Sequence, residues 1–431
     1  MSKLQRLRDN IAALSHALTN NDCDIDVLNK FTGFGGLSFV LNPLDTGMWA
    51  KSDLDCFLDV MKLHQLLREH SCNEKEYKAW MQSLKASTLT AFYTPEKLVK
   101  EIDKVMVCTD FDFENVLDPA SGNGVFLQIG NVAKKIVAYE KDLLTGLLLQ
   151  RLHLRSNLDV RVKGFETIPS DNFGMFDLVA TNVPFGDIKV YDPIYSDSKN
   201  PIRRAAAQMI HRYYVLKGLD CLRNGGLLVY IITSNYLNRD SEQLREALRH
   251  ARLIGAYRLA NNLFRENGTE VGTDLLVLQK HDGRGDLTDD ECLLLSPGTE
   301  QDFPTNFYFT CHQDHVIATS REASTDAYGK PGFVYLHHDG VKGISADLGK
   351  VLAMDMRANA DRELFDSNSK AISISIPKRE KRNTKQETAL QALHDCYTAL
   401  YDGEQQTHKE DAENRKTLNA LYDEYVSKYG Y

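Results

Sequence analysis

Short apolar runs recur through the middle of the chain and are separated by longer stretches with a helical period. Such runs, bounded by turn residues, are typical of strands buried on both faces of a parallel sheet. The predicted strands lie at residues 116–118, 135–139, 160–165, 176–180, 227–233, 253–259 and 274–279. Their alternation with helices predicts an α/β fold, a seven-stranded Rossmann-like sheet with helices on both faces.

Helical periods flank this region on both sides. Residues 1–30 and 52–85 read as helical, and one apolar stripe is expected in a core: Leu54, Phe57, Leu58, Met61, Leu63, Leu66 and Leu67. A further helix is predicted from Ala205 to Leu222, stopped by Asn224-Gly225-Gly226. The pattern predicts four parts: an N-terminal helical region (1–88), a central α/β domain (89–281), a small mixed domain (282–385), and a C-terminal helical hairpin (386–431) that breaks near Asp402-Gly403.

Composition narrows the class of protein. The 431 residues are 42% hydrophobic and 26% charged, as expected for a soluble globular protein of two or three domains. No apolar run approaches the roughly 18 residues of a membrane span, and the N-terminus reads as an amphipathic helix rather than a signal peptide. The eight cysteines form no Cys-x-x-Cys pair, so no metal site is predicted and a reducing cytoplasm is expected.

The stretch Val116-Leu117-Asp118-Pro119-Ala120-Ser121-Gly122-Asn123-Gly124 combines a strand end with a glycine turn and an expected helix start. It lacks the Gly-Lys-Ser/Thr of a phosphate loop and the Gly-x-Gly-x-x-Gly of a dinucleotide site. An acidic residue before a Gly-x-Gly turn suits a ligand with a positive amine, such as S-adenosylmethionine. Asp118, Ala120, Gly122 and Gly124 are therefore candidate cofactor residues, and an ordinary strand-to-helix turn is the alternative.

Acidic residues also end the next two predicted strands. Glu140 follows Asp118 by 22 residues, the spacing at which an acidic side chain binds ribose hydroxyls in sheets of this type. Glu166 ends the third predicted strand, where it could accept a hydrogen bond from an adenine amino group. Together with Asp118, these residues favour a nucleoside-containing cofactor.

An aromatic segment, Ala91-Phe92-Tyr93-Thr94-Pro95, precedes a helix predicted from Glu96 to Val107. Thr94 is expected to cap that helix and Pro95 to occupy its first position, which would leave free N–H groups for a cofactor carboxylate. Tyr93 and Thr94 are therefore candidate cofactor residues, with simple capping as the alternative. The glycine-aromatic loop at 31–37 is either a structural turn or a loop packed against the cofactor domain.

The fourth predicted strand runs into Thr181-Asn182-Val183-Pro184-Phe185-Gly186. An exocyclic adenine amine is a poor nucleophile because its lone pair is delocalised into the ring. A site in which the Asn182 oxygen and a backbone carbonyl accept both N–H protons would direct that lone pair toward an incoming methyl group. Pro184 would keep the loop rigid and Phe185 would stack on the base. Phe264, in the segment between two later strands, is a further base-pocket candidate, although core packing explains it equally well.

These motifs, in this order, resemble the gamma-class N6-adenine DNA methyltransferases, in which a Tyr-Thr-Pro element precedes the cofactor turn and an Asn-Pro-Pro-Phe element follows it. A closer resemblance is to the methylase part of helicase–methylase proteins of phages and conjugative elements. It rests on five segments: 31–37, Asn182–Gly186, Ile210–Tyr213, Gly268–Val271 and Leu418–Asp423. The resemblance is specific at the two central motifs and loose between 281 and 385. Val183 departs from the usual first proline, but valine also supplies a backbone carbonyl.

The resemblance implies an S-adenosylmethionine-dependent methyltransferase, with residues 89–281 as its catalytic domain, that methylates adenine N6 in double-stranded DNA by base flipping and direct transfer. Asn182, Val183, Pro184 and Phe185 would form the catalytic element. Residues 282–385 could be a DNA-recognition arm, and a helicase or nuclease could be a partner in restriction-modification on a mobile element. Two alternatives are an N-methyltransferase acting on RNA or a protein glutamine, and a catalytically silent binding or anti-restriction module. The net charge of −9 argues against a protein that coats DNA non-specifically.

Overall fold

The computed structural model describes residues 2–19, 24–44, 49–130, 133–153, 155–186, 188–325, 329, 331–367, 389, 392–397, 399–400 and 411–429. The chain forms two compact units, Met1–Ile372 and Ser373–Tyr431. Among the described helices, none combines the length and apolar character needed to cross a membrane.

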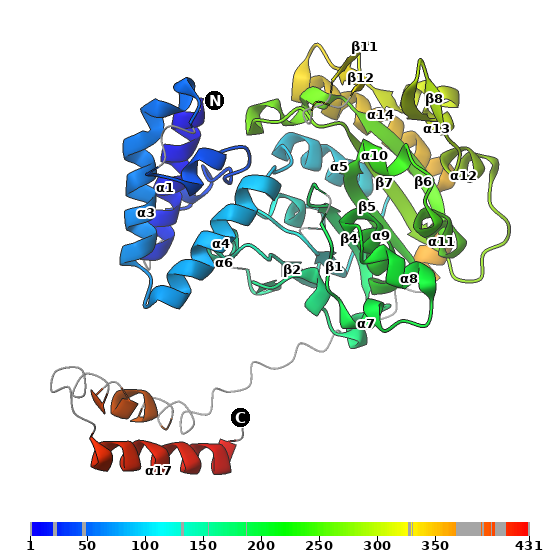
Figure 1. Ribbon diagram of the computed structural model, residues 1–431. Helices are drawn as coiled ribbons and strands as arrows, with labels where there is room; N and C mark the ends of the chain where they lie inside the picture. Colours follow the sequence, from blue (N-terminus) through cyan, green and yellow to red (C-terminus); the bar gives the residue numbers. More distant parts are fainter. Residues whose placement is uncertain are drawn as a thin grey trace. The chain divides into compact units, whose positions relative to one another are not determined.

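The large unit is built on one mixed sheet with the strand order β10-β6-β7-β5-β4-β1-β2-β3 (Figure 1). Its strands are β1 (Asn115–Asp118), β2 (Lys135–Tyr139), β3 (Leu158–Arg161), β4 (Phe176–Asn182), β5 (Leu222–Thr233), β6 (Ala251–Leu259), β7 (Thr273–Lys280) and β10 (Val316–Ile317). The five strands from β3 to β5 are parallel, whereas β7 lies antiparallel between β5 and β6. A strand forms near each of the seven predicted positions, although β3 overlaps the predicted 160–165 only at 160–161, and the two-residue β10 adds an eighth strand at the edge of β6.

Strand register brings the predicted motifs to one edge of the sheet. Asp118, the last residue of β1, pairs with Ala138 on β2, and Leu117 pairs with Val179 on β4. The carboxyl ends of β1, β2 and β4 therefore lie side by side. In parallel α/β sheets, ligands bind beyond the carboxyl ends of the strands where the order reverses, here between β1 and β4.

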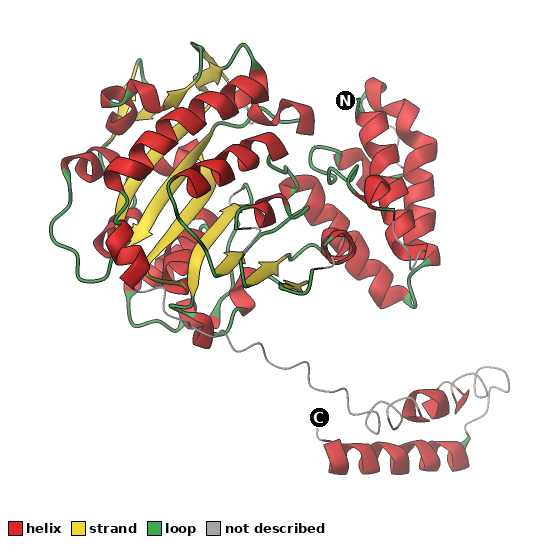
Figure 2. Cartoon of the chain, turned by 180° about the vertical axis from the view of Figure 1, so that it is seen from behind, coloured by secondary structure: helices red, strands yellow, loops and turns green. Residues whose placement is uncertain are grey.

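Helices cover both faces of the sheet, as predicted (Figures 1 and 2). The helices of the central region are α5 (Glu96–Cys108), α6 (Leu143–Leu152), α7 (Pro193–Ser196), α8 (Pro201–Ala206), α9 (Ile210–Cys221), α10 (Ser234–Leu237) and α11 (Glu242–His250). The helix predicted for 205–222 is two helices, α8 and α9. The expected stop at 224–226 is wrong, because β5 starts at Leu222 and runs through Gly225 at a φ of 84°.

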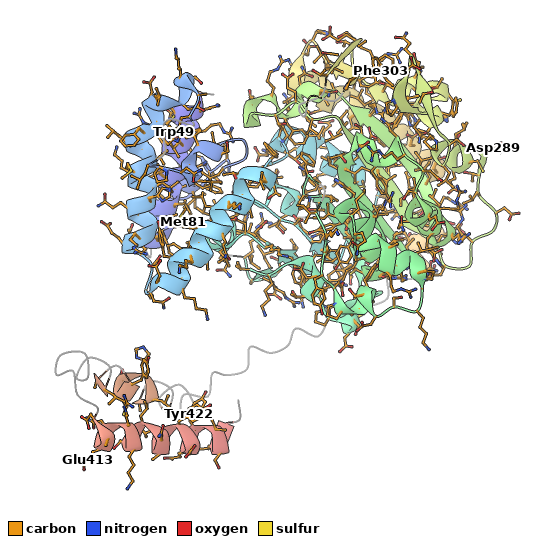
Figure 3. All side chains as sticks on the ribbon, viewed as in Figure 1. Trp49, Met81, Asp289, Phe303, Glu413 and Tyr422 are labelled. Atoms are coloured by element: carbon orange, nitrogen blue, oxygen red, sulfur yellow. The ribbon has the colours of Figure 1, made fainter. Side chains whose placement is uncertain are left out.

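The N-terminal region has an apolar core that includes Trp49 together with Leu144 and Leu148 of α6, and Met81 packs against it (Figure 3). Its helices are α1 (Lys3–Thr19), α2 (Ile25–Leu28), α3 (Phe57–Glu69) and α4 (Glu74–Thr90). The predicted apolar stripe is only partly correct: Leu63 and Leu67 are buried, whereas Leu58 is 70% exposed. Leu54 and Met61 are also exposed, because Cys56 and Val60 occupy the core-facing positions on this side.

Residues beyond 281 do not form a separate body up to 372, which differs from the predicted boundary. β10 extends the main sheet, and α14 packs on α5 and β6. The elements of this segment are α12 (Asp289–Leu294), β8 (Pro297–Glu300), β9 (Phe303–Asn306), α13 (Phe307–Cys311), β11 (Ser320–Thr325), β12 (Pro331–Leu336), α14 (Gly340–Asn359) and α15 (Arg362–Ser367). The small unit contains α17 (Ala412–Tyr429), and the predicted hairpin break at 402–403 lies outside the described residues.

A buried ion pair fixes the segment that follows β4. The Lys217 ammonium on α9 contacts the Asp192 carboxylate, and both side chains are fully buried. The Tyr213 hydroxyl donates a 2.6 Å hydrogen bond to the same carboxylate, whose other oxygen accepts the Ile194 N–H at the start of α7. We expect Lys217→Met to lower the free energy of unfolding by about 3–5 kcal/mol in urea titrations, because it leaves Asp192 buried without a cation.

Two controls define this test. Lys350→Met removes an exposed ammonium from α14 and is expected to change stability by less than about 0.5 kcal/mol. Lys217→Met combined with Asp192→Asn removes both charges and should recover part of the loss. Equal losses for the single variant at 217 and the control at 350 would contradict a structural role for the pair.

Candidate functional site

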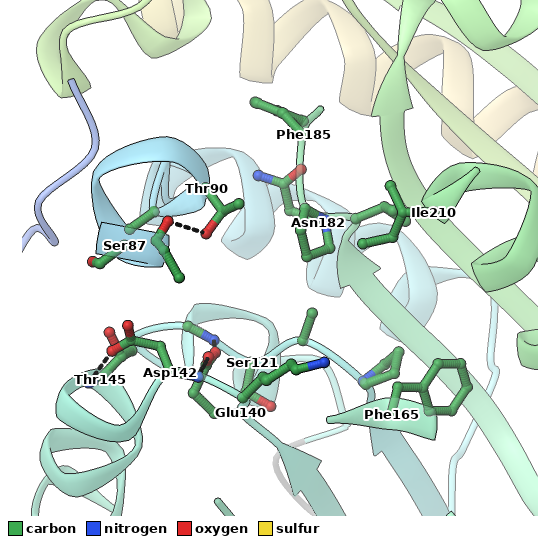
Figure 4. A pocket seen from close by; sticks show the side chains of 18 of the residues that line it. Ser87, Thr90, Ser121, Glu140, Asp142, Thr145, Phe165, Asn182, Phe185 and Ile210 are labelled. Carbon is green, nitrogen blue, oxygen red and sulfur yellow. Dashed lines mark hydrogen bonds between the residues drawn. The ribbon is translucent and has the colours of Figure 1, made fainter. Parts of the chain in front are cut away.

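A cavity of about 480 Å³ lies at the carboxyl ends of β1, β2 and β4. Four segments supply most of its wall: the end of α4 with 91–94, the glycine turn, 140–143, and 182–185. Figure 4 shows Glu140 and Asp142 on one side of the cavity and Asn182 with Phe185 on the other. The structure therefore brings the predicted cofactor and catalytic residues together in one cavity, except Gly124 and Phe264, with Asp118 directly beneath the lining turn.

The glycine turn needs glycine for both conformation and space. Gly122 and Gly124 have φ values of 55° and 85°, in the left-handed region that favours glycine. A Cβ atom at Gly122 would lie 2.7 Å from the ring of Tyr93, and one at Gly124 would lie 2.5 Å from His153 Nε2. The expected α-helix after the turn is instead a short 3₁₀ helix at Val125–Gln128.

Asp118 lies fully buried beneath this turn. Its Oδ1 accepts hydrogen bonds from the Thr181 hydroxyl at 2.7 Å and the Ala120 N–H at 3.2 Å. Its Oδ2 has no hydrogen-bond partner among the described residues. Burial raises the pKa of the Asp118 carboxyl to about 7, because a charged carboxylate is poorly solvated there.

Glu140 connects the end of β2 to the glycine turn. Its two oxygens accept 2.7 Å hydrogen bonds from the N–H groups of Gly122 and Asp142. Burial, with the nearby Asp142, raises the pKa of Glu140 to about 8. Glu166 also lines the cavity, but the prediction that it ends a strand is wrong: β3 stops at Arg161, and Glu166 lies in a 3₁₀ turn where it pairs with Lys141 at 2.6 Å.

Tyr93 connects the N-terminal region to the glycine turn. Its ring lies between Gly122 and Gly33, where added Cβ atoms would approach it to 2.7 and 2.9 Å, and its hydroxyl lies 3.0 Å from the Thr145 hydroxyl. The loop at 31–37 thus packs against the cofactor domain, the second of its two interpretations. On the far side of this loop, the Asn10 side-chain amide donates a 2.7 Å hydrogen bond to the Gly33 carbonyl.

Thr94 does not cap the following helix, contrary to prediction. The N-cap of α5 is Pro95, and the helix starts at Glu96 without a side-chain cap. The Thr94 hydroxyl is buried in the wall of the cavity and has no hydrogen-bond partner among the described residues. A buried polar group without a partner is unfavourable, so this hydroxyl is available to a ligand.

Asn182 is held in one orientation by its neighbour across the cavity wall. Its Nδ2 donates a 3.0 Å hydrogen bond to the carbonyl of Phe92. Because a carbonyl can only accept, the amide nitrogen must face Phe92, and Oδ1 faces the other way. That oxygen is buried and has no partner among the described residues. Val183 N–H donates a 2.9 Å hydrogen bond to the Ile231 carbonyl, which a proline at this position could not make.

Phe185 is almost fully buried at the cavity wall between two other aromatic rings. It is stacked with Phe92 at a centroid distance of 6.1 Å and meets the edge of Phe264 at 5.7 Å. Phe264 is completely buried behind Phe185 and is not among the residues that line the cavity. Of the two interpretations for Phe264, the structure shows core packing.

Several residues that shape the cavity had little or no distinguishing signal in the sequence. Phe92 acts through a backbone carbonyl, which any residue provides. Thr181 holds Asp118, but a threonine before Asn182 has no distinctive spacing. Asp142 caps α6 and accepts a 2.8 Å hydrogen bond from Ser83 on α4, a contact made across 59 residues of sequence. Its place two residues after Glu140 was the only available hint.

The lining suits a nucleoside with a positively charged amino-acid end. In the cavity wall the Asn182 Oδ1 acceptor and the Thr94 hydroxyl have no hydrogen-bond partner among the described residues, and the same is true of Asp118 Oδ2 beneath the glycine turn. A family model described as N-6 DNA Methylase matches residues 77–302, just over half of the chain. The chain belongs to the N-6 DNA methylase family. The cofactor of this methyltransferase is S-adenosylmethionine.

A sequence relative is the Defense against restriction protein B of Escherichia phage P1, 28% identical over 203 residues. The match covers 45% of this chain and 8% of the phage protein, so the chain spans only a small part of that relative's length.

Two solved structures of similar fold belong to type I restriction systems. One is a modification subunit of a putative type I restriction enzyme from Vibrio vulnificus YJ016, with 17% identity, a TM-score of 0.37, and coverage of 76% of this chain and 75% of the other. The second is a methyltransferase subunit from Streptococcus thermophilus, with 14% identity, a TM-score of 0.38, and coverage of 82% and 80%.

The raised pKa of Asp118 predicts a pH-dependent stability that Asp118→Asn removes. The unfolded carboxyl titrates near 3.8 and the folded one near 7, so the unfolded state releases its proton first and stability falls as pH rises between these values. Between about pH 5.5 and pH 8.5, the cofactor-free wild type should lose about 2 kcal/mol relative to Asp118→Asn, whose amide keeps an acceptor for Thr181. Urea unfolding at both pH values measures this difference.

The control is Asp171→Asn, an exposed position in the turn before β4. Its stability relative to wild type should not vary with pH in the same way. A constant difference between wild type and Asp118→Asn at both pH values would contradict the raised pKa.

Proposed function

We propose that the protein transfers a methyl group from S-adenosylmethionine to the N6 amine of adenine in double-stranded DNA. The observation that carries this proposal is the fixed, unpaired Asn182 oxygen in the wall of the cavity that also contains Thr94, Glu140 and the glycine turn. The family description, an N-6 DNA methylase, is consistent with the substrate and the atom methylated.

The cofactor would be held by the predicted residues on one side of the cavity. Asp118 would accept a hydrogen bond from the positive amine, beside Ala120 and the glycine turn. Glu140 would accept hydrogen bonds from the ribose hydroxyls. Tyr93 and Thr94 would contact the amino-acid end, with the Thr94 hydroxyl supplying the hydrogen bond that it lacks within the protein. Glu166 would lie at the adenine end. When bound, S-adenosylmethionine supplies an electrophilic methyl group.

Catalysis would come from the orientation of the substrate amine. The Asn182 oxygen and the Val183 carbonyl would accept its two N–H protons, which directs the nitrogen lone pair away from both acceptors and toward the methyl donor. Phe185 would offer an apolar face to the base. Because the Asn182 oxygen is buried in the cavity wall, the adenine would leave the duplex to reach it, at an unstacking cost of a few kcal/mol. The amine's proton would be released after transfer, and no covalent intermediate with the protein is needed.

The Val183 substitution is compatible with this role. The carbonyl at this position is unchanged, and the Val183 N–H bond to Ile231 restrains the loop in place of a proline ring. Pro184 follows directly and limits the backbone further.

A second candidate function is a catalytically silent module of an anti-restriction system. It is favoured by the name and the 28% identity of the phage P1 relative. Methylation of RNA or of a protein glutamine is a third possibility, since the same oxygen pair would orient those amines. That this protein works with a helicase or nuclease partner, and that residues 282–385 recognise DNA, remain predictions from the sequence resemblance.

Asn182→Ala separates these functions. We expect transfer of radiolabelled methyl groups to duplex DNA to fall at least about 10²–10³-fold, because one of the two acceptors of the amine is lost. The affinity for S-adenosylmethionine, measured by calorimetry, should change little. Wild-type protein is assayed in parallel on DNA, RNA and protein.

Asn359→Ala is a matched control, because Asn359 also donates its amide to a backbone carbonyl, that of Ile254, at 2.9 Å. It should methylate DNA at the wild-type rate. Methyl transfer to protein alone would end the DNA proposal. Cofactor binding without transfer to any substrate would favour the silent module.

A further inference from the structure

A second cavity, of about 470 Å³, lies on the other side of the catalytic loop. Val183, Pro184 and Phe185 line the first cavity, whereas the next residue, Gly186, lines the second. The first turn of α9 is divided in the same way: Ile210 faces the first cavity, and His211 and Arg212 face the second. The two cavities therefore share a wall only a few residues thick.

The second cavity differs from the first in its charged groups. Its described lining contains three arginines and no carboxylate, whereas the first is lined by three acidic residues and two lysines: Glu140, Asp142, Glu166, Lys141 and Lys189. Arg258 is neutralised by Asp274 at 3.0 Å. Neither the half-buried Arg212 nor the exposed Arg239 has an ion pair within the described part of the chain. In a chain with a net charge of −9, two uncompensated cations in one cavity indicate an anionic ligand.

His211 supplies an independent indication of a ligand. Only 4% of the residue's surface is exposed, and it lines the second cavity. Its Nε2 lies 3.2 Å from the Thr233 hydroxyl. Its Nδ1 is buried and has no partner among the described residues. Burial lowers the pKa of His211 to about 4, so the ring is neutral at physiological pH and can exchange a hydrogen bond without adding charge.

Two other features suit a nucleotide. α9, a 12-residue helix, starts at the cavity without a side-chain cap, so its N-terminus adds partial positive charge beside Arg212. Across the cavity, β12 contributes the aromatic residues Phe333 and Tyr335. Arginines that pair with phosphates beside aromatic faces that stack on bases are the combination used to hold an unpaired strand.

We propose that this cavity holds the nucleotide adjacent to the target adenine on the same DNA strand, with Arg212 and Arg239 on its flanking phosphates and Phe333 or Tyr335 against its base. His211 would hydrogen-bond to the same nucleotide. This inference rests on the proposed function, because it assigns a place to the strand whose adenine enters the first cavity. The catalytic loop would then lie between two consecutive bases and hold them apart.

The test is DNA binding as a function of salt, which does not depend on methyl transfer. Fluorescein-labelled duplexes of mixed sequence are titrated with the full chain and S-adenosylhomocysteine at several salt concentrations. Arg212→Gln and Arg239→Gln should each weaken binding and reduce the slope of log K against log salt by about 0.7–0.9, the contribution of one phosphate contact. Arg357→Gln, at an exposed position on α14, is the matched control and should leave both unchanged.

Crosslinking keeps the test independent of any effect of the variants on folding. DNA with 5-iodouracil next to candidate adenines is irradiated with the wild-type protein, and crosslinked peptides are sequenced. Crosslinks are expected at Phe333 or Tyr335. An unchanged salt slope in the double arginine variant, or crosslinks confined to other parts of the chain, would overturn the inference while DNA methylation by the wild type still stands. Failure of the wild type to bind DNA at all, with methylation of protein or RNA, would instead refute the proposed function.

Discussion

One buried hydrogen bond joins the two halves of the site. The Thr181 hydroxyl donates to Asp118 Oδ1 at 2.7 Å, and both side chains are completely buried. Asp118 begins the cofactor turn, and Thr181 immediately precedes Asn182. Because β1 and β4 are adjacent parallel strands, this bond holds the backbone of the turn against the backbone of the catalytic loop. The sheet itself therefore sets the separation between these two walls of the cavity, and such a fixed separation would suit the proposed methyl transfer.

The two cavities differ in the charged side chains that they offer to a ligand. The first concentrates buried carboxyl groups, and burial raises the pKa of Asp118 and Glu140 into the neutral range. Asp118 Oδ2 has no partner among the described residues, which favours a ligand that brings a hydrogen-bond donor, such as a cofactor with a positive amino group. The second cavity collects arginines instead, which favours a phosphate-bearing strand. A single loop, 183–186, separates these environments.

The N-terminal helical region completes the site. Asn10 fixes the loop around Gly33, that loop contacts the Tyr93 ring, and Tyr93 in turn contacts Gly122 in the cofactor turn. One residue before Tyr93, the Phe92 carbonyl orients the Asn182 amide. The region before residue 89 is thus linked through one short segment to both the glycine turn and Asn182.

Sequence patterns predicted most of the strands, the order of the motifs and most of the residues now seen in the first cavity. These are local properties: apolar period, a glycine turn after a strand, and acidic residues at fixed spacing from it. The predictions were wrong at helix boundaries, at the start of α5 beside Thr94 and at the expected stop at 224–226, because alternative boundaries differ by little free energy until tertiary contacts are made. Three features emerged from the folded chain alone: Phe92 orients Asn182, Phe264 lies behind Phe185, and Arg212 and Arg239 line one cavity. These features depend on contacts between residues far apart in the chain. A backbone carbonyl or a single arginine leaves no local sequence pattern from which such a contact could be predicted.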